Sequence, residues 1–132
     1  MSTRGVLDTS IFIARESGRP LAAELLPDQS FISVISVGEL HAGVLTAKDT
    51  STRARRLRTM DAAGEVTSLP INATVAAMWA LQRARLQEMG RRIDVNDLWI
   101  AATAAVADLP VYTQDEGFQV LAELGLVDVI LL

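Results

Sequence analysis

Short apolar segments alternate with segments of helical pattern along the chain, and this alternation constrains the fold more than any other feature. Five apolar or β-branched runs are predicted strands: residues 5–8, 31–35, 66–69, 111–113 and 127–132. Strands that are separated by helices usually pair in parallel. We therefore expect an α/β fold, with a mainly parallel central β-sheet flanked by helices in a single domain over residues 1–132.

The segments between these strands carry the signals that begin and end helices. Thr9 or Ser10 can cap a first helix, and Ser36 with Glu39 has the spacing of a capping box. Gly64 and Gly90 follow helical patterns at positions typical of helix ends. After the first helix we expect further helices at residues 20–26, 36–48, 50–63, 72–89 and 98–107, and one more that follows Asp115.

The composition is that of a folded protein with a real core. Half of the 132 residues are hydrophobic and the mean hydropathy is +0.29, so a membrane segment has to be considered. The longest apolar run, residues 98–107, is about half of the ~20 residues that a span needs, and Asp97 and Asp108 bracket it. The first five residues lack the apolar stretch of a secretory signal. With no cysteine, thiolate metal sites are excluded. We expect a cytoplasmic protein with no membrane association.

The formal net charge of −4 argues at first against nucleic acid, but the arginines are clustered. Arg53, Arg55 and Arg56 lie on one predicted helix. They are either a solvated helix face or a surface that contacts RNA phosphates. If they contact phosphates, neutralising all three flattens the salt dependence of RNA binding.

Four acidic residues are predicted to meet at one edge of the sheet. Asp8 and Asp115 directly follow strands, and Glu39 and Asp97 are expected in the first turns of helices that begin at the same edge. Each of them alone has a structural explanation as a helix cap or a turn residue. Together they would repel one another unless a cation neutralised them. Oxygen ligands suit Mg²⁺ or Mn²⁺, so the sequence predicts a site for one of these metals.

These acids also stand in motifs that resemble a known family. The segments are Val6-Leu7-Asp8-Thr9-Ser10-Ile11, Ser36-Val37-Gly38-Glu39-Leu40-His41-Ala42-Gly43-Val44, Asn96-Asp97-Leu98-Trp99-Ile100-Ala101-Ala102 and Val111-Tyr112-Thr113-Gln114-Asp115. In this order and spacing they resemble the PIN-domain ribonucleases, specifically the VapC-type toxins of bacterial VapBC toxin–antitoxin systems. Many relatives have Asn where Ser10 stands, a departure that leaves the acids intact.

The resemblance implies a PIN-like domain with Asp8, Glu39, Asp97 and Asp115 as the catalytic, metal-binding acids. Thr113 and Ser10 would orient ligands or water beside them. The implied activity is hydrolysis of RNA phosphodiester bonds with Mg²⁺ or Mn²⁺, and a tRNA or rRNA substrate would be typical. The implied partners are a cognate antitoxin and a second copy of the chain in a homodimer.

Two other residues near these acids have less direct interpretations. Asp94 is a candidate for a peripheral role at the site. His41 is the only histidine, and a partly buried position at a helix or subunit contact is favoured over a catalytic role.

Other functional classes fit less well. The first predicted strand is not followed by the Gly-rich turn of a dinucleotide-binding enzyme, and no Gly-Lys-Ser/Thr motif is present. A phosphorylated receiver domain would use a lysine after a late strand, whereas the only lysine is Lys48. The remaining alternative is a non-catalytic PIN-like module that binds RNA or protein. Incubation with RNA, with and without divalent metal, separates it from the enzyme.

Overall fold

A computed structural model describes residues 2–132, so only Met1 of the predicted domain lies outside the described residues. A five-stranded, fully parallel sheet runs through the middle, in the order β3-β2-β1-β4-β5. Its strands are β1 (Arg4–Leu7), β2 (Gln29–Ser33), β3 (Thr67–Leu69), β4 (Val111–Thr113) and β5 (Val129–Leu131). The predicted α/β class and the parallel sheet are confirmed.

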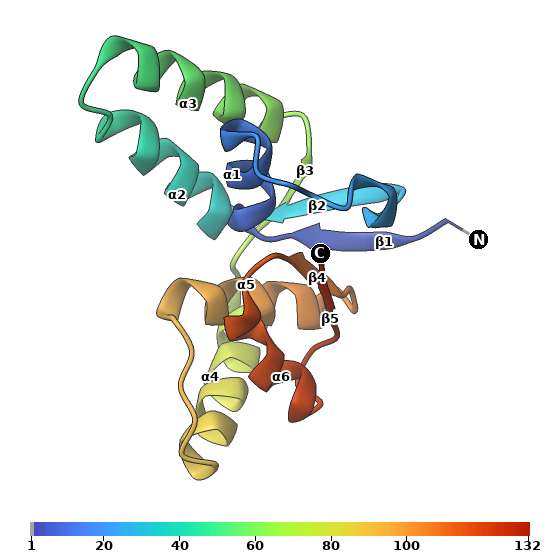
Figure 1. Cartoon of the computed structure of the whole chain (residues 1–132). Helices are drawn as coiled ribbons and strands as arrows, with labels where there is room; N and C mark the ends of the chain where they lie inside the picture. Colours follow the sequence, from blue (N-terminus) through green and yellow to red (C-terminus); the bar gives the residue numbers. More distant parts are fainter. Residues whose placement is uncertain (1) are drawn as a thin grey trace.

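Helices lie on both sides of this sheet, as Figure 1 shows: α1, α2 and α3 on one side, and α4, α5 and α6 on the other. Their bounds are α1 (Thr9–Ser17), α2 (Val34–Leu45), α3 (Thr50–Ala63), α4 (Ala73–Glu88), α5 (Val95–Val106) and α6 (Gln119–Glu123). Two short 3₁₀ turns complete the chain, η1 (Ala23–Leu25) and η2 (Glu116–Phe118). No helix among the described residues combines the length and apolar character needed to cross a bilayer.

Alternation along the strands divides the core in two. Successive side chains of a strand point to opposite faces, so each central strand contributes to both layers. One cluster, beneath α4 and α5, contains Val6, Phe31 and Val111. The other, beneath α1, contains their chain neighbours Leu7, Ile32 and Tyr112. Both faces of the central strands are covered, and for this reason consecutive residues at their buried centres are apolar, as in Val6-Leu7, Phe31-Ile32 and Val111-Tyr112.

The order of the strands determines where a ligand can bind. From β1 the chain moves outward to β2 and β3, and then returns through α4 and α5 to the other side of β1, where it forms β4 and β5. The direction of winding therefore changes between β1 and β4. In open parallel sheets ligands bind beyond the carboxyl ends of the strands at such a switch point. Here that position lies just after Leu7 and Thr113.

Several local predictions were wrong at the residue level. Ser33, not Ser36, caps α2, because β2 ends at Ser33 and the Ser33 side chain accepts a hydrogen bond from the backbone N–H of Ile35. Glu39 consequently lies in the second turn of α2, and no capping box forms. The predicted helix at 20–26 is reduced to η1, since Pro27 holds Leu26 in an extended conformation.

Candidate active site

Asp8 is the most buried acid of the site. It follows β1 directly, caps α1, and exposes only 3% of its surface. Its Oδ2 accepts a hydrogen bond from the hydroxyl of Thr113 at 2.8 Å and a longer one from the backbone N–H of Ser10 at 3.3 Å. A buried carboxylate needs such donors or a cation. The structure therefore places Asp8 at the switch point, with its side chain fixed from two elements.

Thr113 and Ser10 join Asp8 to Asp115. The Thr113 hydroxyl oxygen accepts from the backbone N–H of Asp115 at 2.9 Å and lies 3.3 Å from the hydroxyl of Ser10. Ser10 in turn accepts from the backbone N–H of Gln114 at 3.0 Å. Thr113 is fully buried. These contacts hold the end of β4 against the start of α1, so the two predicted orienting residues lie beside Asp8.

Asp97 lies in the first turn of α5 and faces the other carboxylates. Its pKa is raised from 3.8 to about 8, first because burial penalises its charged form, and then because Asp8, Asp115 and Asp94 are negatively charged nearby. A hydrogen bond with the Asp115 carboxyl contributes as well. Asp8, Asp97 and Asp115 are therefore close enough to interact, as the sequence predicted. Asp115 itself is exposed, at the start of η2.

Asp94 has a structural explanation that the sequence left open. It is the N-cap of α5, and its Oδ1 accepts hydrogen bonds from the backbone N–H groups of Asn96 and Asp97 at 3.0 and 3.2 Å. It thereby fixes the turn that carries Asp97.

Glu39 is held at the side of this group. Its Oε1 accepts a hydrogen bond from the hydroxyl of Thr9 at 2.6 Å, and its Oε2 lies 3.5 Å from the side-chain amide of Asn96. Thr9 also lies 2.8 Å from the hydroxyl of Ser36. Glu39 is not among the charges that raise the pKa of Asp97. The sequence interpretation missed Thr9 and Asn96, although each is the immediate chain neighbour of a predicted acid.

The donor set fits a hard divalent cation coordinated partly by water. All of the converging groups are carboxylates, and the pKa of Asp97 is raised first by burial and then by the negative charge of its neighbours, which a cation would neutralise. Within residues 2–132, no three His, Asp or Glu side chains are grouped closely enough to hold a metal ion by themselves, so the predicted four-acid metal site is not preformed. Mg²⁺ commonly binds through one or two carboxylates, with water and substrate phosphate as its other ligands. Asp8, which is buried, and Asp97, which senses its charge, are residues that could hold such an ion.

The arginines predicted to contact RNA have protein partners. Arg56 donates to the carbonyl of Gly43 at 2.6 Å, and Arg53 donates to the carbonyl of Ala47 at 3.3 Å. Arg55 lies 3.9 Å from Glu16. Arg56 thus ties α3 to α2, and Arg53 ties α3 to the loop that joins the two helices. Their role in RNA binding stays a prediction.

The remaining candidate residue is His41, which is exposed in the single chain. Because its side chain lies on the outer surface of α2, the predicted partial burial at a helix contact was wrong, and a subunit contact stays a prediction.

Comparisons with known proteins agree with this fold and site. The family model of the PIN domain matches residues 5–124. The chain belongs to the PIN-domain family, within its VapC-type branch. It is 48% identical to Ribonuclease VapC5 of Mycobacterium tuberculosis (strain ATCC 25618 / H37Rv) over 126 residues, which are 96% of this chain and 93% of that protein. Ribonuclease VapC4 of the same strain is 33% identical, with 96% and 97% covered.

A solved structure shows the same likeness in three dimensions. It is the crystal structure of a member of the VapBC family of toxin–antitoxin systems, VapBC-5 from Mycobacterium tuberculosis. The match has a TM-score of 0.90 and 44% sequence identity, and it covers 98% of this chain and 99% of the other.

Proposed function

We propose that this chain is a metal-dependent endoribonuclease and the toxin component of a type II toxin–antitoxin pair. The observation that carries the proposal is the buried Asp8 at the switch point, where Asp8 and Asp115 lie close enough to Asp97 to help raise its pKa. Further support comes from the name of a relative that is 48% identical, Ribonuclease VapC5, and from the VapBC toxin–antitoxin structure. The catalytic domain spans residues 1–132.

The carboxylates would bind the metal that the reaction needs. Asp8 and Asp97 would hold Mg²⁺ or Mn²⁺ directly, with help from Asp115 and Glu39. When bound, the metal activates a water molecule and neutralises charge that develops on the phosphate. No side-chain nucleophile is required.

The surrounding hydroxyl groups position these acids. Thr113 and the backbone of Ser10 hold the Asp8 carboxylate in one orientation. Thr9 does the same for Glu39. Such outer partners commonly affect metal affinity by about 10–100-fold.

Purified protein incubated with labelled tRNA and rRNA tests the activity. We expect cleavage with Mg²⁺ or Mn²⁺ and none with EDTA. Asp8→Asn and Asp97→Asn should each lower the rate by more than about 100-fold, because loss of metal stabilisation costs several kcal/mol. Asp61→Asn, at an exposed position on α3, is the matched control. Metal-independent cleavage, or normal cleavage by both site variants, would refute the proposal. RNA binding without cleavage would identify a non-catalytic module.

The cognate antitoxin, a homodimer of this chain and a cytoplasmic location belong to the same proposal. Support for the antitoxin is that the similar crystal structure is of a toxin–antitoxin system. Co-purification with the product of an adjacent gene tests the first, and the mass of the free chain by light scattering tests the second.

A further inference from the structure

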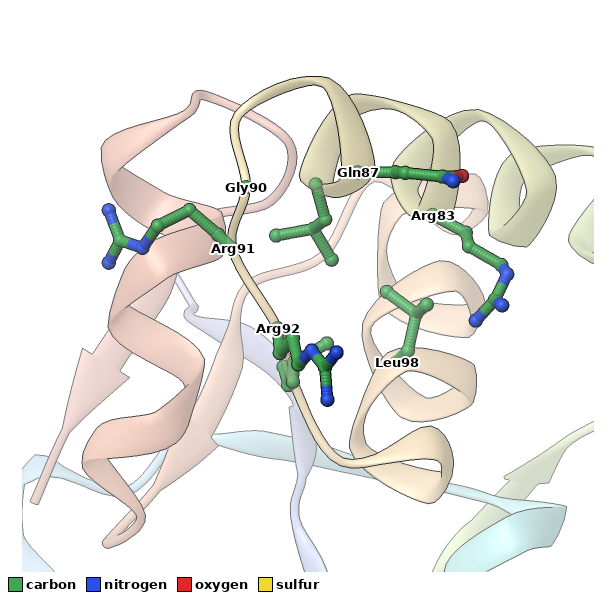
Figure 2. A pocket seen from close by; sticks show the side chains of 8 residues that line it. Arg83, Gln87, Gly90, Arg91, Arg92 and Leu98 are labelled. Atoms are coloured by element: carbon green, nitrogen blue, oxygen red, sulfur yellow. The ribbon is translucent and has the colours of Figure 1, made fainter.

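A pocket of about 520 Å³ lies between α4, the loop that follows it and the beginning of α5. Its floor is apolar and includes Leu86 and Leu98, which are both buried. Gln87 and three arginines, Arg83, Arg91 and Arg92, complete its wall. Figure 2 shows Arg83 and Arg92 on opposite sides of Leu98, with Arg91 turned away from them. The volume is within the range of about 300–1,000 Å³ that is typical of ligand pockets.

The charge of this pocket is the opposite of the charge of the chain. The net charge is −4, yet every charged residue that lines the pocket is an arginine. Arg91 is paired with Glu123 of α6 at 3.3 Å. Arg92 has no ion pair or hydrogen bond among the described residues. The pocket is therefore a local positive site that attracts an anion.

Arg83 is positioned in advance. Its guanidinium lies over the ring of Trp79, 5.5 Å from the ring centre, and Trp79 stacks on Trp99 of α5 at 4.7 Å. An arginine already held by an aromatic ring loses less side-chain freedom when it binds a ligand.

An apolar floor, two guanidinium groups and one side-chain amide suit a flat ring that is linked to a phosphate. Bases of single-stranded RNA stack on arginine guanidinium planes and form hydrogen bonds along their edges, and phosphates pair with arginine. From this chemistry we propose that the pocket binds one nucleotide of the RNA strand beside the cleavage point, its base over Leu98 and its phosphate between Arg83 and Arg92. This inference rests on the proposed ribonuclease function and names a specificity site for it.

The chain connects this pocket to the acidic site. Leu98 directly follows Asp97, and Arg92 precedes Asp97 by five residues, which span at most about 17 Å of extended chain. The pocket thus lies within a few nucleotides of the carboxylates. Asp94 caps α5 between them, so the loop that carries Arg92 has a fixed end.

Binding in EDTA tests the pocket separately from catalysis. The probes are a short fluorescein-labelled oligouridylate and a sugar–phosphate strand of the same length without bases. The variant is Arg83→Gln with Arg92→Gln. Two control variants each remove one arginine outside the pocket. Arg4→Gln changes the first residue of β1, whose guanidinium lies over Phe31, and Arg58→Gln changes a residue of α3.

We expect the double variant to lower the slope of log K against log salt by about 0.7, since the two arginines share one phosphate and each phosphate contact on a single strand contributes about 0.7. This change in slope corresponds to about 5-fold weaker binding at about 0.1 M salt. The wild-type protein should prefer the strand with bases, and the double variant should lose this preference. Gln87→Glu, which leaves both arginines in place, should also weaken binding.

Unchanged affinity and slope in the double variant would overturn the proposal, as would equal binding of the two strands by the wild-type protein. RNA binding that stays normal while co-purification with the antitoxin is lost would also overturn it, and would assign the pocket to an acidic peptide. Failure of the proposed function is a different result, because it is an absence of metal-dependent cleavage and leaves the binding data in EDTA unaffected.

Discussion

Replacing Asp97 with asparagine tests whether the acidic side chains really meet in the folded protein. In the metal-free protein the pKa of Asp97 is about 8, whereas its ordinary value is 3.8. At a pH between these two values, Asp97 keeps its proton in the folded state but has released it in the unfolded state. Raising the pH therefore favours unfolding, and the free energy of unfolding falls over this window.

The size of this effect follows from proton linkage. One proton of difference between the states changes the free energy of unfolding by about 1.4 kcal/mol per pH unit. This figure is an upper limit for Asp97, because the side chain is partly exposed and solvent screens its neighbours. An asparagine side chain cannot ionise, so the Asp97→Asn variant should lack this contribution throughout the window and become more stable than the wild-type protein as the pH rises towards 8.

The assay is urea unfolding in EDTA at a series of pH values from 5 to 8.5, with Asp61→Asn as a surface control that should follow the wild-type curve. Added Mg²⁺ should stabilise the wild-type protein at pH 8 more than the Asp97→Asn variant, since the cation replaces the proton. Parallel pH profiles of the wild-type and Asp97→Asn proteins would refute the reasoning. They would mean that neither burial nor the carboxylates of Asp8 and Asp115 raise the pKa of Asp97.

Two further predictions concern the residues that hold the site in place. Thr113→Val removes the hydroxyl that donates to Asp8 and accepts from the backbone of Asp115, and should lower the free energy of unfolding by about 2–4 kcal/mol. Thr113→Ser keeps a hydroxyl and should retain most of the wild-type stability, so equal unfolding midpoints for the two variants would contradict this role. Gly5→Ala places a Cβ against the ring of Tyr112 and should lower the free energy of unfolding by about 1–3 kcal/mol, whereas Gly38→Ala, in open space within α2, should not destabilise the protein. A thermal unfolding temperature of Gly5→Ala as high as that of the wild type would disprove the clash.

Local sequence was sufficient for the elements whose signals come from a few neighbouring residues. The helix at Thr50–Ala63 and the strand at Val111–Thr113 have the predicted bounds. Asn72 caps α4 as expected, because its side chain reaches the backbone N–H of Val75 within one turn. The capping of α2 was mistaken because two serines, Ser33 and Ser36, could both serve. The pairing of β2 with β3 decides between them, and that contact comes from a distant part of the chain.

The candidate site shows the same division. The identity of its acids could be predicted, since a carboxylate that directly follows an apolar strand, as Asp8 and Asp115 do, is costly without a partner. Thr113 was implied as a partner by the resemblance to the family, although it is 105 residues from Asp8. Thr9, which is 30 residues from Glu39, was not predicted. The arginine pocket could not be predicted either, because in the sequence its arginines are ordinary surface positions of a helix and a loop.

The sequence by itself thus determined the parallel α/β class and the chemical character of the site, because hydrophobic periodicity and the charges of side chains are properties of short segments. The tertiary structure alone decided that β4 pairs with β1, and so brought Asp8, Asp97 and Asp115 together while Glu39 is held to one side by Thr9. The physical reason is that strand order depends on how the whole chain buries two apolar layers at once, and no local preference specifies it.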